Sequence, residues 1–416
     1  MSLLIKNVLL EGRIVDVLIE ANKIKQISQK SSAKAERVID GTNKAIIPGL
    51  VNSHTHAAMT LLRGYGDDMN LMEWLQEKIW PIEAKLTAED IYWGTKFACL
   101  EMIKTGTTCF HDMYWFPEAQ HKAVEEMGMR AVLDYTFFDN NDKEKRKKVM
   151  EEAPGIIQRL HTKNPRIKMA LGPHAIYTVS KEGLQWAMRF ATEKGLLVHF
   201  HLCETKSEVD DCIKTHGKKP IPLLEEWGFL QPNLITAHSV WLDDEDIQIL
   251  KKHDVKVVHN PTANMKLAIG KAFRFKQLQE AGLLIGLGTD GVASNNNLDM
   301  FEIMKIAALL QKFSYDDPTL LKAHEAFELA TKNGYQILGI DAGTIEEGKL
   351  ADLSLIDLDH PALIPLHNLA SNIVYAGNGD CVDTVIIDGK VIMENRKVAG
   401  EEEIKKRFIK AVSRLT

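Results

Sequence analysis

The chain has 416 residues, of which 45% are hydrophobic and 26% charged, and its formal net charge is −6 at pH 7. This length favours two or three domains, and the composition is typical of a packed globular protein. No basic run or stripe stands out, so we expect no nucleic-acid partner. No apolar run approaches the roughly 18 residues of a membrane span, so we expect no membrane association.

The cysteines and the first residues of the sequence indicate the cellular compartment in which we expect the protein. The five cysteines are an odd number, widely spaced and without a CxxC pair, which argues against a disulfide framework and against a thiolate zinc site. The opening MSLLIKNVLLEGR lacks the basic region, sustained apolar core and cleavage site of a signal peptide. We therefore expect a cytoplasmic protein.

Both ends of the chain read as β-structure. LLIKNVLL, RIVDVLIE and KIKQI are separated by polar turns, and KLADLSLIDLD and VDTVIIDGKVIMENRKV repeat this pattern near the other end. In the last of these, Asp388-Gly389 separates two apolar runs, which is a strong hairpin signal. The final segment, 401–415, places one apolar face at helical spacing, formed by Ile404, Phe408, Val412 and Leu415.

Between residues 49 and 345 the pattern alternates between short apolar runs and helix-like stretches. Thr87 and Asp90 form a capping box at the start of one such stretch, and Asp243 or Asp244 can cap another. Eight strand candidates with helices between them predict a (β/α)₈ barrel. The eight runs are LVNSHTH, TTCFHDM, RAVLDYTFF, IKMALGPHA, LLVHFHLCET, LITAHSV, VKVVHN and LLIGLGTD.

Several of these runs begin apolar and end in residues that carry chemistry. In such barrels the functional site forms where the carboxyl ends of the strands meet, so residues distant in sequence converge at one mouth. The polar residues at the run ends are His54, His56, His174, His201, Glu204, His238 and Asp290.

His54 and His56 are the first candidate metal ligands. Residues i and i+2 of a strand point to the same side, so both imidazoles face one way and can bind one ion. Taken alone, an HxH pair is equally well a chance pairing at a polar strand end.

Later strand ends supply further candidates. His201 is a possible third ligand and Glu204 lies just beyond its strand, whereas His199 reads better as a hydrogen-bonded core or outer-shell histidine. An aspartate such as Asp290 at the end of an apolar strand is costly without a partner, which a metal would supply. Alternatively, Asp290 caps the next helix and His238 is a core histidine. The coincidence of five polar strand ends favours the metal site.

The ordered motifs PGLVNSHTH, HFHLCET, TAHSV and LGTDGVASNN strongly resemble the metal-dependent deaminases of the amidohydrolase superfamily. The closest likeness is to the branch with 5′-deoxyadenosine deaminase and methylthioadenosine/S-adenosylhomocysteine deaminase. The likeness covers nearly the whole chain, including MNLMEWLQEKIWPIEAKL and HNPTANMKLAIG. It implies a barrel over 49–345 and a smaller β-sandwich domain built from 1–48 and 346–416, the latter with a C-terminal helix.

The resemblance also implies a role for each candidate residue. One divalent ion is expected, Zn²⁺ with Fe²⁺ and Mn²⁺ as alternatives, because a His/Asp site does not choose among them. The implied metal ligands are His54, His56, His201 and Asp290.

The implied catalytic residues are His238, which would hold or help deprotonate a water, Asp290, which can take its proton, and Glu204, which would protonate the ring nitrogen beside the attacked carbon. Glu83 and His174 would contact substrate, Glu83 at the ribose hydroxyls, together with Glu204 and Asp290. Trp74 would wall the pocket, although a buried tryptophan is as often plain core.

The implied reaction is hydrolytic deamination of adenine in a 5′-modified adenosine, such as 5′-deoxyadenosine, methylthioadenosine, S-adenosylhomocysteine or adenosine. The family's arginine at the distal end of the substrate is matched here by Tyr135, which favours a small or apolar 5′ group. The sequence does not indicate a role for the charged loop 139–148.

Two alternatives compete with this interpretation. One is a guanine or aminotriazine deaminase or a chlorohydrolase on the same scaffold. The other is a non-catalytic scaffold, which predicts lost metal ligands. We expect a small-molecule nucleoside as the partner, and a homo-oligomer, either a tetramer or a dimer.

Overall fold

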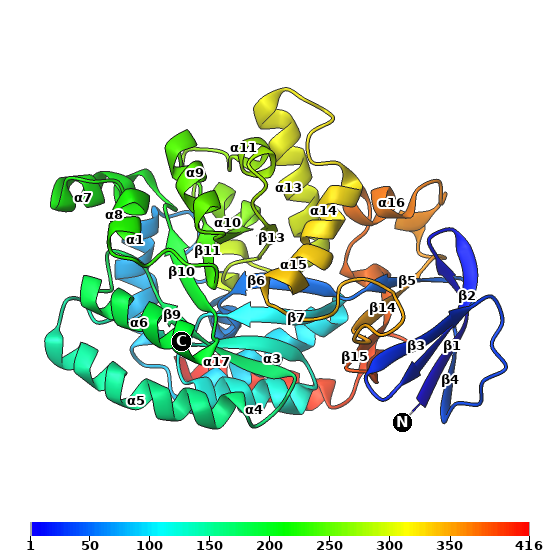
Figure 1. Cartoon of the computed structure of the whole chain (residues 1–416). Coiled ribbons are helices and arrows are strands. Elements are labelled where there is room, and N and C mark those ends of the chain that lie inside the picture. The colour runs from blue at the N-terminus through cyan, green and yellow to red at the C-terminus, as the bar shows by residue number, and fades with distance from the viewer. Residues whose placement is uncertain (1, 416) are drawn as a thin grey trace.

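The computed structural model describes residues 2–415, which form a parallel barrel and a separate mixed sheet (Figure 1). The barrel sheet has eight strands that follow one another in chain order, and every neighbouring pair is parallel. All eight predicted runs form its strands, so the predicted barrel is confirmed. The strands are β6 (Leu50–Thr55), β7 (Thr107–Asp112), β8 (Arg130–Phe137), β9 (Ile167–Pro173), β10 (Val198–Leu202), β11 (Leu234–His238), β12 (Lys256–His259) and β13 (Ile285–Leu287).

Helices cover the outside of this barrel (Figure 1). Because side chains fill the inside and helices cover the outside, β6, β7, β10 and β11 are buried at every position. Just beyond the strand ends, the Asp290 backbone N–H donates to the His54 carbonyl at 3.0 Å and links the last strand to the first.

The helices of the barrel layer begin where the sequence indicates. Thr87 and Asp90 form the predicted capping box, and Asp243 forms a second one with Asp246. The longer helices are α3 (Ala88–Lys104), α4 (Pro117–Met127), α5 (Lys143–His161), α6 (Lys181–Lys194), α7 (Lys206–His216), α8 (Pro220–Glu226), α9 (Asp244–Lys252), α13 (Met300–Tyr315), α14 (Ala323–Leu329) and α16 (Leu369–Tyr375).

Shorter helical segments complete the chain. Those that precede α3 form one side of the pocket described below. The segments are η1 (Ala57–Leu62), α1 (Leu71–Trp74), η2 (Leu75–Ile79), α2 (Trp80–Glu83), α10 (Pro261–Lys266), α11 (Phe275–Glu280), α12 (Val292–Asn295), α15 (Lys332–Ile337), η3 (Pro361–Leu363) and η4 (Gly379–Cys381).

The second sheet combines strands from both ends of the chain, as predicted. Its hydrogen-bonded order is β17-β16-β15-β14-β5-β1-β2-β3, with β4 paired to β1, and the antiparallel pairing of β5 with β14 joins the two ends. Apolar residues from both ends share one core cluster. The strands are β1 (Ser2–Leu10), β2 (Arg13–Glu20), β3 (Lys23–Ser28), β4 (Arg37–Asp40), β5 (Lys44–Pro48), β14 (Leu353–Asp357), β15 (Val382–Ile387), β16 (Lys390–Glu394) and β17 (Lys397–Val398).

The predicted hairpin and C-terminal helix are both present. Asp388 (φ 53°) and Gly389 (φ 73°) turn between β15 and β16, and two residues with positive φ are what such a two-residue turn requires. Helix α17 (Glu401–Leu415) packs on α3, where the Phe97 and Phe408 rings stack with centroids 3.9 Å apart. Among residues 2–415, no helix is both long enough and apolar enough to cross a membrane.

A buried ion pair ties the barrel to the mixed sheet. Arg130, the first residue of β8, donates from Nε and Nη2 to the two carboxylate oxygens of Asp352, which directly precedes β14, at 2.5 and 3.1 Å. Asp352 also accepts from the Tyr335 hydroxyl and the Asp388 backbone N–H. Both charged residues are at most 5% exposed. Removing one charge therefore leaves the other buried without its counter-charge.

We predict that Arg130→Met lowers the free energy of unfolding by about 3–5 kcal/mol, because Asp352 keeps its charge and loses its partner. Urea denaturation followed by circular dichroism measures this change. The matched control is Arg37→Met, which removes the half-exposed ion pair of Arg37 with Glu394 and should cost at most about 1 kcal/mol. Equal losses in the two variants would contradict the role given to the buried pair.

Candidate active site

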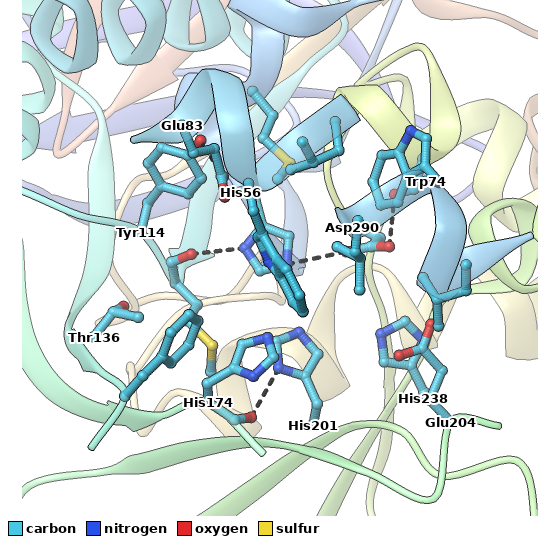
Figure 2. Close-up of a pocket in the computed structure, with 18 of the residues that line it drawn as sticks. His56, Trp74, Glu83, Tyr114, Thr136, His174, His201, Glu204, His238 and Asp290 are labelled. Carbon is cyan, nitrogen blue, oxygen red and sulfur yellow. Dashed lines mark hydrogen bonds and ion pairs between the residues drawn. The ribbon is translucent and has the colours of Figure 1, made fainter. Parts of the chain in front are cut away.

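Four residues converge at the carboxyl ends of the barrel strands, and three of them, His56, His201 and Asp290, are labelled in Figure 2. His54 and His56 lie at the end of β6, His201 lies on β10, and Asp290 follows β13, so the predicted set comes together. One ligand atom from each lies within 4.8 Å of those from the others. The Nε2 atoms of His54 and His56 are each 3.2 Å from Asp290 Oδ1. This spacing is that of donors arranged around one point.

The other ring nitrogen of each histidine has a partner of its own. Nδ1 of His56 donates to the Met113 carbonyl at 2.6 Å, and Nδ1 of His201 donates to the His174 carbonyl at 2.9 Å. Nδ1 of His54 lies 2.9 Å from Nε2 of His199. A histidine whose Nδ1 carries the proton keeps its lone pair on Nε2, which is the form that binds a metal.

Asp290 is held in position as an ionised group. It has a left-handed backbone (φ 62°), and its Oδ2 accepts from the Ser294 hydroxyl at 2.7 Å. Burial would raise the pKa of Asp290, but the adjacent rings of His54 and His56 and the charges nearby lower it well below its usual value. Three imidazoles and a carboxylate are a donor set suited to a divalent cation such as zinc. The residues therefore fit the expected metal.

His238 and Glu204 stand next to the ligand set (Figure 2). Nδ1 of His238 donates to Asn264 Oδ1 at 2.8 Å, which leaves the ring's Nε2 free to accept. The carboxylate of Glu204 lies 3.8 Å from His238 Nδ1, and burial raises the pKa of Glu204. A carboxyl with a raised pKa is suited to carry a proton. Asn264 belongs to the motif HNPTANMKLAIG, but nothing in the sequence indicates this contact.

Three members of the ligand set, His56, His201 and Asp290, line a cavity whose volume, including space open to solvent, is about 690 Å³. Trp74, which is 5% exposed, lines the cavity and also belongs to an apolar cluster, so its position is compatible with both sequence interpretations. Glu83 enters from α2 and accepts from the Tyr114 hydroxyl at 2.6 Å. Burial lowers the pKa of His174 to about 3, so this lining ring is neutral. The role of Tyr114 had no signal in the sequence.

The side chains that β8 and its end contribute to the cavity differ from expectation. Thr136 and Phe138 line it, whereas Tyr135 packs against the outer hydrophobic core. The interpretation that Tyr135 occupies the place of a substrate-binding arginine is therefore wrong, because neighbouring strand residues face opposite sides. Among the described residues, those lining the cavity include no lysine or arginine.

Comparison with known proteins identifies the class of protein. The model of the amidohydrolase family matches residues 45–392. The chain is 50% identical over 420 residues to a 5′-deoxyadenosine deaminase of Methanoregula boonei, covering 100% of this chain and 95% of the relative. It is 51% identical to a 5-methylthioadenosine/S-adenosylhomocysteine deaminase of Archaeoglobus fulgidus, covering 94% and 92%. The chain belongs to the amidohydrolase family.

A solved structure supports the same assignment. An adenosine deaminase from Xanthomonas campestris with bound zinc superimposes with a TM-score of 0.93 at 33% identity, covering 99% of this chain and 98% of that one. The likeness therefore extends over both the barrel and the mixed sheet.

Proposed function

We propose that this protein catalyses hydrolytic deamination at C6 of adenine in 5′-modified adenosines, releasing ammonia and the inosine analogue. The observation that carries the proposal is the pair His238 and Glu204 beside the ligand set, at the floor of a cavity that also presents Glu83. The names of the relatives from Methanoregula boonei and Archaeoglobus fulgidus support this substrate class.

The proposed cofactor is one Zn²⁺ ion held by the four ligands described above. Support comes from the imidazole-rich donor set and from the bound zinc in the related Xanthomonas campestris structure. A divalent ion at such a site lowers the pKa of a bound water from about 15.7 toward 7, which supplies the nucleophile at neutral pH.

The protein's own residues would then move the protons. Asp290 Oδ and the free Nε2 of His238 accept protons from the attacking water and orient it toward C6. The carboxyl group of Glu204 donates a proton to N1 as negative charge develops there, and a second proton is delivered to the departing amino group. Water thus adds its oxygen to C6, the C6–N bond breaks, and ammonia leaves.

Residues that line the cavity outside the ligand set would orient the substrate. The Glu83 carboxylate would accept hydrogen bonds from the ribose hydroxyls, with Tyr114 fixing its position. Neutral His174 and the ring of Trp74 would contact the nucleoside. Because no lysine or arginine is among the described lining residues, a small uncharged 5′ group is favoured over one that ends in a carboxylate.

We also propose a domain division, an oligomeric state and a location for this protein. We infer a catalytic barrel domain over 49–345 and a second domain from 1–48 and 346–416. We also infer a homo-oligomer, either a dimer or a tetramer, and a location in the cytoplasm. The five cysteines are all free and buried, which supports a reducing compartment.

The function is tested by ammonia release from the zinc-reconstituted protein with 5′-deoxyadenosine, methylthioadenosine, S-adenosylhomocysteine, adenosine and guanine. We expect the first two to give the highest kcat/KM and S-adenosylhomocysteine to be at least about 10-fold poorer, the cost of one unpaired charged group. Turnover of guanine or triazines alone would overturn the proposal. A protein without metal or turnover would be a non-catalytic scaffold.

Glu204→Gln should lower kcat by about 10²- to 10⁴-fold, because the amide cannot donate and accept the transferred proton. Metal content measured by atomic absorption should stay at the wild-type level, since Glu204 lies outside the ligand set. Glu193→Gln, on the exposed side of α6, is the matched control and should leave kcat unchanged. Loss of metal in the Glu204 variant would show that its role is misassigned.

Glu83→Gln should raise KM for 5′-deoxyadenosine about 10-fold or more, because a charged acceptor for the ribose hydroxyls is lost. The comparison substrate is 2′,5′-dideoxyadenosine, which lacks one of these hydroxyls. The variant should discriminate less between the two nucleosides than the wild type does. If both proteins discriminate equally, Glu83 does not bind the ribose.

A further inference from the structure

Behind the proposed metal site lies a second cluster of titratable residues that the reaction does not use. His111 on β7, Asp134 on β8 and His199 on β10 are all 0% exposed. Asp134 Oδ1 lies 2.9 Å from His111 Nε2, and Asp134 Oδ2 lies 2.8 Å from His199 Nδ1. The cluster meets the ligand set at one point, where His199 Nε2 is 2.9 Å from His54 Nδ1.

Asp134 reaches His199 across the strand between them because that strand carries a glycine at the crossing point. A Cβ atom added to Gly172 of β9 would lie 2.8 Å from the Asp134 Cβ. Any other residue at this position would push the carboxylate aside. Gly172 therefore leaves the space that the contact between Asp134 and His199 needs.

The direction of each hydrogen bond in this cluster follows from Asp134, the acceptor at which the series of hydrogen bonds ends. Burial would raise the pKa of Asp134, but the charges and hydrogen bonds of His111 and His199 lower it, so the carboxylate is ionised and can only accept. His199 Nδ1 therefore carries a proton. If His54 is to bind a metal through Nε2, its Nδ1 must carry the proton. That proton is then donated to Nε2 of His199, which must itself be unprotonated.

The opposite arrangement excludes metal binding by His54. If His199 instead donated from Nε2, His54 Nδ1 would have to accept, and the proton of neutral His54 would stand on Nε2. That proton would occupy the lone pair that faces Asp290. The tautomer of His199 thus selects the tautomer of His54.

We propose that Asp134 and His199 form a hydrogen-bonded relay that fixes the metal-binding tautomer of His54 and so sets the affinity for the divalent ion. This proposal rests on the metal site of the proposed function. Asp134 and His199 act as positioning residues, since they touch neither the substrate nor the ion. The direct hydrogen-bond partner of a metal-bound histidine, here His199, typically contributes 10- to 100-fold in metal affinity.

The same three residues could alternatively be read as a second metal site, since one donor atom from each lies within 4.8 Å of the others. The contacts favour the relay, because each ring faces a different oxygen of Asp134. The His111 and His199 rings also stack, with centroids 3.9 Å apart and planes 24° from parallel. Metal stoichiometry separates the two interpretations.

The test is transfer of zinc from the full-length protein to a competing chelator. Asp134→Leu keeps the branched shape of the side chain and removes both acceptor oxygens, so we expect about 10- to 100-fold weaker zinc binding. His199→Phe keeps the ring and removes the acceptor for His54, and it should show a similar loss. The double variant should bind zinc no more weakly than the poorer single variant, because both changes break the same relay.

His111→Gln is the matched control, since it lies in the same cluster, retains an N–H donor for Asp134 and stands outside the relay. Its zinc affinity should stay close to that of the wild type, and all variants should keep one zinc per chain and the wild-type KM. Unchanged affinity in both relay variants, additive losses in the double variant, or two zinc ions per wild-type chain would overturn the proposal. Wild-type protein that binds zinc normally without deaminating nucleosides would overturn the proposed function alone.

Discussion

The position of a single proton on each of three imidazole rings is the constraint on which this site depends. Each ring can donate a lone pair to a shared cation only if its other nitrogen carries the proton. The structure meets this condition with three different acceptors, namely the Met113 carbonyl, the His174 carbonyl and the His199 ring. Met113 and His174 each follow a strand next to that of their histidine, whereas His199 lies on β10, across the barrel from His54 on β6. The chemistry of the site therefore requires the barrel's register to be correct.

Charge balance imposes a second requirement on the same cavity. Its described lining includes three carboxylates, Glu83, Glu204 and Asp290, and no lysine or arginine. Burying like charges together is unfavourable unless a cation or proton compensates them. A divalent ion at the ligand set would compensate Asp290, and burial raises the pKa values of Glu83 and Glu204, which favours their protonated forms. The same arrangement discourages substrates that bring a further negative charge.

The sequence predicts the barrel and the metal site well because both leave local signals. Each strand is a short apolar run with a polar end, and His54 and His56 have the spacing that places two side chains on one face. Tyr135 was misassigned because a run of apolar residues does not fix which side faces the cavity, and a shift of one residue exchanges Tyr135 for Thr136.

Contacts between residues far apart in the chain leave no such signal. Asn264 meets His238, and Asp134 meets His199, only after the strands have assembled. The apolar face of residues 401–415 likewise predicts that this helix packs, but not that its partner is α3 rather than the sheet beside it.

The pairing of β5 with β14 has a consequence for the order in which the molecule is made. Residues 44–48 leave the ribosome early, whereas their partners at 353–357 follow only after the whole barrel sequence has been synthesised. During translation, the N-terminal strands therefore expose an unpaired edge that can associate with other nascent chains. Such long-range closure is intrinsically slow, and the mixed sheet cannot be complete before the whole barrel sequence has been synthesised.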